Sequence, residues 1–233
     1  MKPNINNYDD LMAFLDAKVA SVSWEEFYGE RKFKAPFILQ NTMPDENLVE
    51  LLGMDISIKS ALELGCGEGR NAIYMAQKGI NVTALDISPT AISNARAIAS
   101  DSGTNINFLC QDVFQAAIGK DYDLVYDSGL LHHLAPHRRI TYLELLQAAL
   151  KPGGYFGLTC FAWGENCADE VDDWAFYEQK FSAGVAFTKE RLIELFAPYF
   201  KVIEIRKYRN QVPNTIQGLQ FMWVCLFKDK REK

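Results

Sequence analysis

Three glycines at every second position, Gly65, Gly67 and Gly69, follow the apolar run Ala61–Leu64, and a helical pattern begins at Arg70. Glycine adopts positive φ angles without strain and lets a ligand approach the main chain closely, so this spacing predicts a turn that exposes backbone N–H groups. The N-terminus of a helix directly behind the turn adds a partial positive charge that suits a carboxylate or a phosphate. The alternative is an ordinary strand-to-helix turn, which requires one glycine rather than three. We therefore interpret the segment as a buried strand, a ligand-binding turn and the start of a helix.

Strand patterns and helical patterns alternate from this turn to the middle of the chain. The expected strands are Ala61–Leu64, Asn81–Leu85, Ile106–Leu109, Leu124–Tyr126 and Tyr155–Thr159, and the expected helices are Arg70–Lys78, Pro89–Ala99 and Pro136–Leu150. A turn is expected at Lys151–Gly154, and the chain closes with a helix at Lys189–Phe196 and strands at Lys201–Ile205 and Leu219–Phe227. Strands that alternate with helices form parallel crossover units. The predicted fold class is therefore α/β, a doubly wound sheet with helices on both faces and a ligand above the carboxyl ends of its strands.

Two further regions complete the predicted domain organisation. Residues 1–55 are expected to form a helical cap or lid, because Tyr8–Leu39 has a helical, aromatic pattern and Pro44 opens another helix that runs to about Leu52. Residues 56–233 are expected to form the α/β domain, with a lid-like insert at about 160–187. Between Cys160 and Phe187 the insert holds six acids and six aromatic rings, and because it follows the carboxyl end of a strand we expect it over the ligand crevice. The aromatic residues of the cap are Trp24, Phe27, Tyr28, Phe33 and Phe37, and those of the insert include Trp163, Trp174, Phe176, Tyr177 and Phe181.

The composition narrows the function classes. A net charge of −6 argues against general nucleic-acid binding, which neutralises phosphates, although Arg206, Lys207 and Arg209 leave room for a local basic patch. Five cysteines without a CxxC pair argue against a disulfide framework or a zinc ribbon and favour free thiols in a reducing cytoplasm. No apolar stretch is long enough to span a membrane, and the N-terminus lacks the apolar core of a signal peptide. We therefore expect a cytoplasmic protein that acts on neither nucleic acid nor membrane.

The glycine spacing also distinguishes two classes of nucleotide-binding turn. In the dinucleotide fingerprint Gly-x-Gly-x-x-Gly the third glycine would fall at Arg70, whereas here it comes one residue earlier, at Gly69. With Glu63 two residues before the first glycine, the segment resembles the Glu/Asp-x-Gly-x-Gly-x-Gly motif of the class I S-adenosylmethionine-dependent methyltransferases. The resemblance extends from about Leu51 to Leu158 and implies a Rossmann-like, mostly parallel seven-stranded sheet whose last strand runs antiparallel between its neighbours. It also implies S-adenosyl-L-methionine as the cofactor and S-adenosyl-L-homocysteine as the product.

Asp86 stands at the carboxyl tip of the second expected strand, beside the glycine turn. A carboxylate there can accept hydrogen bonds from both hydroxyls of a ribose. Its alternative role is the N-cap of the helix that begins at Pro89, a role that Ser88 can fill. The resemblance implies that Ile87 lies against the adenine face. It also implies that the cofactor is bound along the turn residues Gly65, Cys66, Gly67 and Gly69.

Two further acids are candidate cofactor ligands. Asp112 follows the third strand and resembles the family residue that accepts a hydrogen bond from the adenine amino group, while the N–H of Val113 can donate to a ring nitrogen. A turn-forming aspartate is the alternative. Glu63 lies inside an otherwise apolar strand, where an ionised carboxylate needs partners. The resemblance assigns Glu63 to the methionine part of the cofactor and places Tyr126 and Ser128 beside the sulfonium and its amino-acid tail.

The residues after the fourth strand are the candidates for methyl transfer. Asp127 is interpreted either as a partner of the cofactor's ammonium group or as an acid on the acceptor's side, and His132 is a candidate base because imidazole titrates near neutrality. A base is needed only where the acceptor must lose a proton. His133 is expected to pack under the sheet and bond to backbone, which is also the alternative for His132. A metal site formed by His132, His133 and His137 is not expected, because no carboxylate or thiol spacing supports one.

These features together predict a methyltransferase that acts on a small molecule, as a monomer or a homodimer. The Asn-Pro-Pro-Tyr motif of amino-directed nucleic-acid methyltransferases is absent, and a resemblance to the thiopurine, halide/thiol and tellurite-resistance branch favours sulfur or another soft nucleophile. The insert is interpreted either as a wall of a pocket for an aromatic or partly cationic acceptor or as a solvated lid. The alternatives are a methyltransferase of protein or RNA and a non-catalytic module that binds S-adenosylmethionine, whereas Arg70 disfavours a nicotinamide oxidoreductase.

Overall fold

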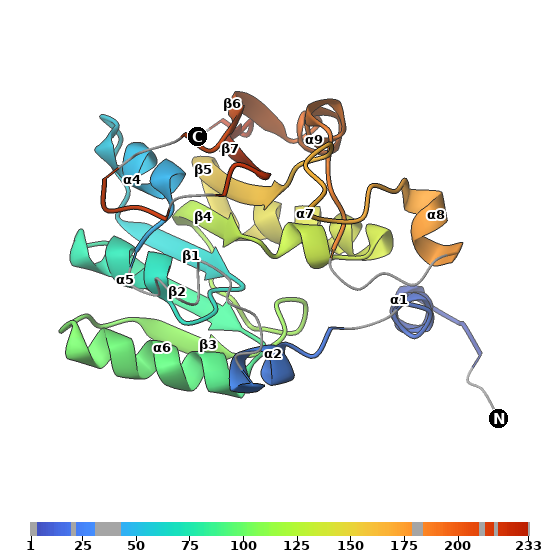
Figure 1. Cartoon of the computed structure of the whole chain (residues 1–233), viewed down its shortest axis with the longest axis horizontal. Helices are drawn as coiled ribbons and strands as arrows, with labels where there is room; N and C mark the ends of the chain where they lie inside the picture. The colour runs from blue at the N-terminus through green and yellow to red at the C-terminus, as the bar shows by residue number, and fades with distance from the viewer. Residues whose placement is uncertain are drawn as a thin grey trace.

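A computed structural model describes residues 4–19, 22–30, 43–178, 184–209, 213–216 and 219–232 of the chain. Phe33, Phe37 and Phe181 lie outside these residues, as does the part of the predicted N-terminal helical pattern from residue 31 to residue 39. The described chain forms a seven-stranded sheet with helices packed on both faces (Figure 1).

The sheet has the strand order β3-β2-β1-β4-β5-β7-β6. Neighbouring strands from β3 to β5 are parallel, and β7, which lies between β5 and β6, runs antiparallel to both. The predicted doubly wound α/β fold with an antiparallel last strand is therefore confirmed. The strands are β1 (Ser60–Leu64), β2 (Asn81–Asp86), β3 (Asn107–Cys110), β4 (Tyr122–Ser128), β5 (Leu150–Phe161), β6 (Phe200–Lys207) and β7 (Met222–Asp229).

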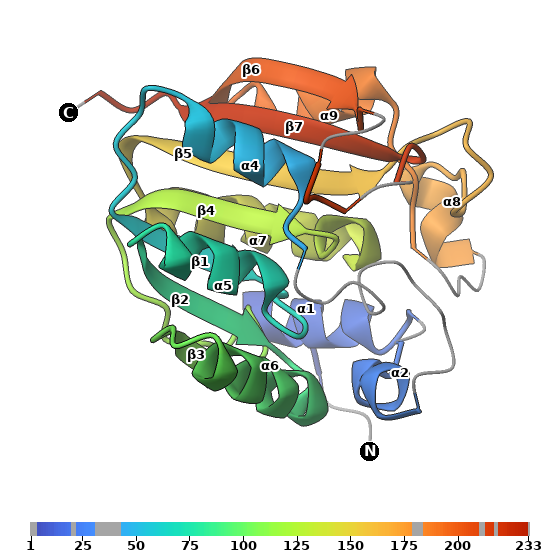
Figure 2. The ribbon, with the colours of Figure 1, turned by 60° about the vertical axis from the view of Figure 1, so that its left-hand side comes forward.

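Helices α4, α5 and α6 cover one face of the sheet, and α7 and α9 cover the other (Figure 2). On the first face Leu48, Met75 and Ile92 are buried in one apolar cluster. On the second face Tyr142 and Phe196 pack against the sheet. Parallel strands covered on both faces carry apolar side chains toward each, which explains their near-continuous apolar runs. The helices are α1 (Tyr8–Asp16), α2 (Trp24–Glu30), α4 (Glu46–Gly53), α5 (Arg70–Gln77), α6 (Pro89–Asp101), α7 (Pro136–Ala149), α8 (Asp173–Glu178) and α9 (Lys189–Phe196), with a 3-10 turn at Leu131–His133.

The structure bears on two further expectations from the composition. All five cysteines are free thiols, three of them buried, as the absence of CxxC pairs predicts. Within the ranges given above, each helix is too short or too polar to cross a lipid bilayer.

The fifth strand begins earlier than predicted, because β5 includes Lys151–Gly154, which the sequence predicts as a turn. Tyr122 pairs with Leu150 and the next pair joins Leu124 to Tyr155, so β5 carries extra residues between two successive pairs. One glycine of this bulge has a φ of 72°, which glycine adopts without strain. A bulge of this kind accommodates a proline and two glycines inside a strand, although the same residues usually indicate a turn.

Segments from distant parts of the sequence meet at the carboxyl edge of the sheet (Figure 2). Glu25 of α2 is hydrogen-bonded to the first turn of α6. Asp16 of α1 pairs with His137 of α7, and Arg139 of α7 pairs with Asp173 of α8. The first turns of α6 and α7 follow β2 and β4, so α1, α2 and α8 lie at the edge where a doubly wound sheet binds its ligand. Their role as a lid, and a domain boundary at residue 55, stay predictions.

Candidate functional site

The three glycines form the predicted turn between β1 and α5. Gly65, Gly67 and Gly69 have φ angles of 66°, 53° and 81°, a region that favours glycine. At Gly69 a Cβ would lie 3.1 Å from both Ala95 and Phe108, so this glycine also allows α5 to start close to its neighbours. The turn therefore depends on glycine for its backbone conformation and for its packing.

Three N–H groups of this turn are engaged within the protein. Cys66 donates to the carbonyl of Leu85 at 2.9 Å, and Gly69 donates to the carbonyl of Cys66 at 2.9 Å. Gly67 donates to Asp86 at 2.8 Å. The prediction that the turn presents bare N–H donors to a ligand is therefore wrong at these positions. What the glycines provide instead is the positive-φ backbone of the turn and the space beside it, which Leu130, the Tyr28 hydroxyl, Ala95 and Phe108 occupy.

Asp86 is held by backbone N–H groups at the carboxyl tip of β2. Its Oδ2 accepts a hydrogen bond from Gly67 at 2.8 Å, and its Oδ1 accepts one from Ser88 at 2.9 Å. The side chain of Ser88 caps α6 by accepting from Ala91, so Asp86 is not needed as the N-cap. Burial raises the pKa of Asp86, and the backbone hydrogen bonds oppose that rise. Because each carboxylate oxygen accepts more than one hydrogen bond, Asp86 keeps capacity for two ribose hydroxyls.

Replacing Asp86 with alanine is expected to weaken S-adenosylmethionine binding by about 10- to 100-fold, because a hydrogen bond to a charged group contributes about 1.5–3 kcal/mol. Titration calorimetry measures the affinity, and circular dichroism checks that the variant is folded. Asp101→Ala, which removes an exposed acid at the far end of α6, is the matched control. Unchanged affinity in the Asp86 variant would contradict the ribose assignment.

Glu63 is a buried carboxyl group at the base of the turn. The residue is 1% exposed, and among the described residues its Oε2 has no hydrogen-bond partner. Burial raises the pKa of Glu63 to about 8, although Arg70 and Asn71 oppose the rise. A buried carboxylate without a full set of partners is costly, so a cation that reaches it gains a strong interaction. The cationic amino-acid end of S-adenosylmethionine, which the resemblance assigns to this position, fits that chemistry.

The candidates for the adenine side lie where β2 and β3 end. Ile87 is 54% exposed beside the buried Asp86, so its apolar surface is available to a flat ring. Asp112 is half-buried and accepts a hydrogen bond from the N–H of Phe114 at 2.9 Å, which is the contact of a turn-forming aspartate. Val113 is buried next to it. Their contacts with adenine stay predictions.

Sequence reasoning missed a buried ion pair beside the turn. Nη2 of Arg70 lies 2.8 Å from Oδ1 of Asp45, and Arg70 also donates to Ser128 at 2.9 Å. Tyr126 and Tyr208 donate to Asp45 at 2.9 and 2.8 Å. Ser128 thus lies next to the start of α5, whereas the hydroxyl of Tyr126, predicted to border the sulfonium, is engaged by the ion pair. Arg70 at the position of a dinucleotide fold's third glycine was the one sequence signal of this arrangement.

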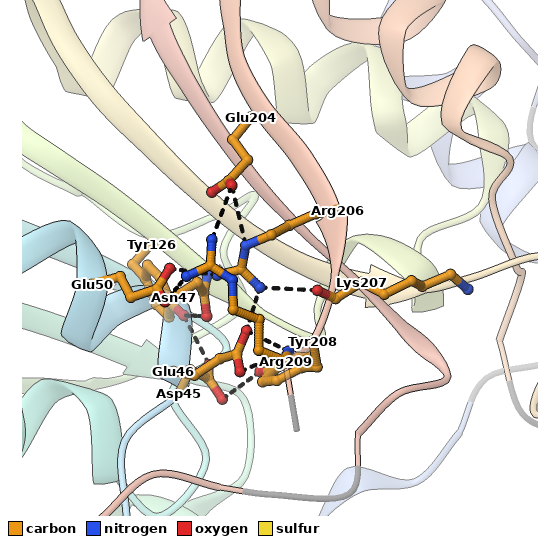
Figure 3. A network of polar contacts seen from close by, with 10 residues as sticks. All are labelled: Asp45, Glu46, Asn47, Glu50, Tyr126, Glu204, Arg206, Lys207, Tyr208 and Arg209. Carbon is orange, nitrogen blue, oxygen red and sulfur yellow. Dashed lines mark hydrogen bonds and ion pairs between the residues drawn. The ribbon is translucent and has the colours of Figure 1, made fainter. Parts of the chain in front are cut away.

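The N-terminus of α4 carries a wider polar network, which Figure 3 shows together with Asp45, the acidic partner of Arg70. Both carboxylate oxygens of Glu46 accept hydrogen bonds from the N–H of Arg209 at 2.8 Å, and Glu46 pairs with Arg206. Glu50 pairs with Arg206 and Arg209, and Lys207 pairs with an acid of the insert at 2.6 Å. The three basic side chains that left room for a nucleic-acid patch each face an acid of this chain. The charges of Arg206 and Arg209 instead bind α4 to the end of β6, and that of Lys207 binds the insert there.

Both carboxylate oxygens of Asp127 are engaged on the α7 side of the sheet. Leu130 donates to Oδ1 at 2.7 Å, and Leu131 and Tyr142 donate to Oδ2 at 3.0 and 2.6 Å. Burial raises the pKa of Asp127 to about 6, and these hydrogen bonds oppose the rise. The arrangement favours a structural role in the turn after β4 over the predicted role in methyl transfer.

His132 is buried and His133 is half-buried among aromatic rings. His132 stacks on Phe161 with 3.7 Å between ring centroids, and its Nδ1 accepts a hydrogen bond from the N–H of Phe161 at 3.3 Å. Burial lowers the pKa of His132 well below its usual value and that of His133 to about 4. Both rings are therefore neutral near pH 7, and a catalytic role of His132 stays a prediction that this geometry disfavours. Across the described ranges, no three His, Cys, Asp or Glu side chains gather in a way that could hold a metal ion.

One aromatic residue of the insert is exposed to solvent, and another is hydrogen-bonded within the protein. Trp174 of α8 is 85% exposed. The hydroxyl of Tyr177 lies 2.8 Å from Nδ1 of His137 and accepts a hydrogen bond from the N–H of His137 at 3.1 Å. For this part of the insert, the structure favours the solvated-lid interpretation over the pocket wall.

Residues 61–154 match a protein family described as Methyltransferase domain. An uncharacterized methyltransferase of Synechocystis sp. is 33% identical over 131 residues, which are 56% of this chain and 54% of the relative. The 2-heptyl-1-hydroxyquinolin-4(1H)-one methyltransferase of Mycobacteroides abscessus is 30% identical over 121 residues, which are 51% of this chain and 53% of the relative. The chain spans about half the length of the curated relatives it matches.

Two solved structures share the fold over most of the chain. One, described as "Conversion of a Disulfide Bond into a Thioacetal Group during Echinomycin Biosynthesis", has a TM-score of 0.67 at 24% identity and covers 91% of this chain and 93% of the other. The other is the Burkholderia thailandensis 1,6-didemethyltoxoflavin-N1-methyltransferase with bound 1,6-didemethyltoxoflavin and S-adenosylhomocysteine. Its TM-score is 0.63 at 22% identity, with 98% of this chain and 93% of that chain covered. At such identities the likeness concerns the fold.

The sheet order and the glycine turn, flanked by acids on β1 and β2, define a Rossmann-like nucleotide-binding domain. Within that class, residues 61–154 match the methyltransferase domain family, as the resemblance to the class I S-adenosylmethionine-dependent methyltransferases predicts. S-adenosylmethionine is the cofactor of this domain, and it supplies an activated methyl group when bound.

Proposed function

We propose that this protein transfers the methyl group of S-adenosylmethionine to a small-molecule acceptor. The observation that carries the proposal is the buried carboxyl group of Glu63, whose Oε2 lacks a partner among the described residues and which lies at the base of the glycine turn. Asp86 at the tip of the neighbouring strand complements it. In this proposal Glu63 holds the cationic end of the cofactor, Asp86 holds the ribose, and Ile87, Asp112 and Val113 line the adenine.

The residues after β4 supply alignment rather than acid–base chemistry. Transfer from a sulfonium is an in-line displacement at an activated carbon, so the rate depends on positioning and on exclusion of water. Both oxygens of Asp127 accept hydrogen bonds, Nδ1 of His132 accepts one from the backbone, and His133 is neutral with a pKa of about 4. We therefore expect an acceptor that arrives as a nucleophile, such as a thiolate, an ionised hydroxyl or a neutral ring nitrogen.

Two observations support a small acceptor. The basic side chains of Arg206, Lys207 and Arg209 are paired with acids, so they do not form a surface that would neutralise the phosphates of RNA. In addition, one curated relative is named for a quinolinone acceptor, and one structural neighbour is named for a didemethyltoxoflavin. A methyltransferase of protein or RNA and a non-catalytic binding module are the alternatives that the experiment below separates.

Incubation with methyl-labelled S-adenosylmethionine and three separate acceptor pools tests the proposal. The pools are a metabolite extract, purified cell RNA and purified cell protein. The expected result is label in a low-mass product, identified by mass spectrometry, together with release of S-adenosylhomocysteine. Label in RNA or protein would establish the first alternative. Cofactor binding without release of S-adenosylhomocysteine in all three pools would establish the binding module.

Trp174→Ala is expected to leave kcat/KM for the identified acceptor within about twofold of the unsubstituted protein, because exposed side chains away from a site contribute little. Rates of S-adenosylhomocysteine release measure this. Trp24→Ala is the comparison variant, because Trp24 packs against His133 at 4.5 Å at the carboxyl edge of the sheet. A loss of tenfold or more in the Trp174 variant would restore the pocket-wall interpretation of the insert.

A further inference from the structure

Helix α2 brings a tyrosine hydroxyl to the glycine turn. A Cβ added to Gly67 would collide with the hydroxyl of Tyr28, so the hydroxyl fills the space that the missing side chain leaves. The ring of Tyr28 is half-buried, whereas burial raises the pKa of its hydroxyl well above the ordinary value, and the nearby Asp86 adds to the rise. Among the described residues this hydroxyl has no hydrogen-bond partner. The hydroxyl is therefore an available hydrogen-bond donor next to the main chain at Gly67.

Glu25 ties α2 to the first turn of α6. Its carboxylate accepts hydrogen bonds from Oγ of Ser88 at 2.5 Å and from the N–H of Thr90 at 3.1 Å, and it also accepts one from the hydroxyl of Thr90. These hydrogen bonds lower the pKa of Glu25. Because Glu25 and Tyr28 are three residues apart on a helix, they project to the same side of α2. The contact with α6 thus also sets where Tyr28 points.

Helix α2 also contacts the segment after β4. The ring of Trp24 packs edge-on against His133 at 4.5 Å, and Phe27 contacts Trp24 and Tyr28 with centroids 5.4 and 5.2 Å away. In the sheet, β1 lies between β2 and β4. A helix that is fixed to the ends of β2 and β4 therefore crosses the end of β1, where the glycine turn lies.

From this position of α2 across the end of β1, we propose that Tyr28 is a cofactor-binding residue and that Glu25 positions it. Helix α2 closes over the loaded crevice, and the hydroxyl of Tyr28 donates a hydrogen bond to an oxygen of the bound cofactor in front of Gly67. Since the hydroxyl fills that space, α2 lifts whenever the cofactor enters or leaves. The inference rests on the proposed function, because it concerns the same site.

Stopped-flow tryptophan fluorescence, to which Trp24 of α2 contributes, tests this with S-adenosyl-L-homocysteine and the full chain. Tyr28→Phe removes only the hydroxyl, so Kd is expected to rise about 3- to 10-fold, mainly through faster dissociation. Glu25→Gln frees the helix, so the association and dissociation rate constants are both expected to rise about threefold or more, with a smaller change in Kd. Thr90→Val weakens the same contact from α6 and is expected to act in the same direction.

Glu26→Gln is the matched control, because it makes the same charge change at the adjacent, exposed position of α2 and is expected to leave both rate constants unchanged. Circular dichroism confirms that each variant is folded. If the unsubstituted protein binds the ligand but Tyr28→Phe, Glu25→Gln and Thr90→Val all behave like it, the inference is overturned and the proposed function stands. If the unsubstituted protein does not bind S-adenosyl-L-homocysteine, both are overturned.

Discussion

Replacing Glu63 with glutamine is expected to weaken S-adenosylmethionine binding by roughly 30- to 700-fold. Glutamine keeps the shape of the side chain but not the charge that attracts the cationic end of the cofactor, and losing one partner of a buried charge pair costs about 2–4 kcal/mol. Titration calorimetry at pH 8 measures the change. Glu194→Gln, at an exposed position of α9, is the control and is expected to bind normally. A Glu63 variant with the affinity of this control would remove the main support for the proposed site.

The ionisation of Glu63 also makes the affinity for the cofactor depend on pH. Burial raises the pKa of Glu63 to about 8, so the free protein carries it mostly protonated at pH 7. A cationic ligand favours the carboxylate, so binding releases a proton and the affinity increases as the pH rises toward about 8. Calorimetry at pH 7 in buffers of different ionisation enthalpy measures this proton release. It is expected to disappear in Glu63→Gln, and its persistence there would assign the proton to another group.

The stability of the free protein is expected to respond to pH with the opposite sign. The pKa of Glu63 is raised from 4.5 to about 8 in the folded state, so folding retains a proton that the unfolded chain loses between these values. Stability therefore falls as the pH rises through that window, by on the order of a few kcal/mol, and Asp127, with its pKa raised to about 6, adds to the lower part of the fall. Thermal unfolding at pH 5 and pH 8.5 is expected to show Glu63→Gln gaining stability over the unsubstituted protein only at the higher pH. An equal difference at both values would contradict this.

Asp45→Asn is expected to lower the free energy of unfolding by about 3–5 kcal/mol, because it leaves the buried guanidinium of Arg70 without its counter-charge. Asp45 is 0% exposed and also accepts hydrogen bonds from Tyr126 and Tyr208. The side chain of asparagine has one accepting oxygen in place of two, so its NH2 group would face at least one of these donors. Urea unfolding at pH 7 measures the loss. Glu204→Gln, which removes a partly exposed acid from an arginine that keeps its pairs with Glu46 and Glu50, is expected to cost only about 0–1 kcal/mol. A loss in Asp45→Asn no larger than in this control would show that the ion pair contributes little to stability.

Most of the sheet and its helices could be predicted from the sequence because local signals coincide with the observed ends. Ser88 followed by Pro89 marks the start of α6, and the glycine spacing marks the start of α5 at Arg70. Where local chemistry and tertiary pairing disagree, prediction failed. The proline and glycines in Lys151–Gly154 indicate a turn, but pairing with β4 draws them into β5.

From the sequence, a site residue could be predicted only where its position along a strand determines its place in the site. The location of Glu63 inside an apolar strand and of Asp86 at a strand end is visible in the sequence. By contrast, the partner of Arg70 is the N-cap residue of another helix, and the sequence does not reveal whether the oxygens of Asp127 are already engaged. The contact of Tyr28 with the glycine turn depends on where α2 is placed by residues of α6, which no local pattern encodes.

The first turn of α7 has a consequence for exchanging parts between related proteins. His137 contacts both Asp16 of α1 and Tyr177 of α8, and two residues further on Arg139 pairs with Asp173 of α8. Helices α1 and α8, which are far apart in the sequence, are thus both bound to the first turn of α7. Transferring α8 alone into a related protein would separate it from His137 and Arg139, which bind it here. A chimera that transfers α1, α8 and the first turn of α7 together would keep all of these contacts.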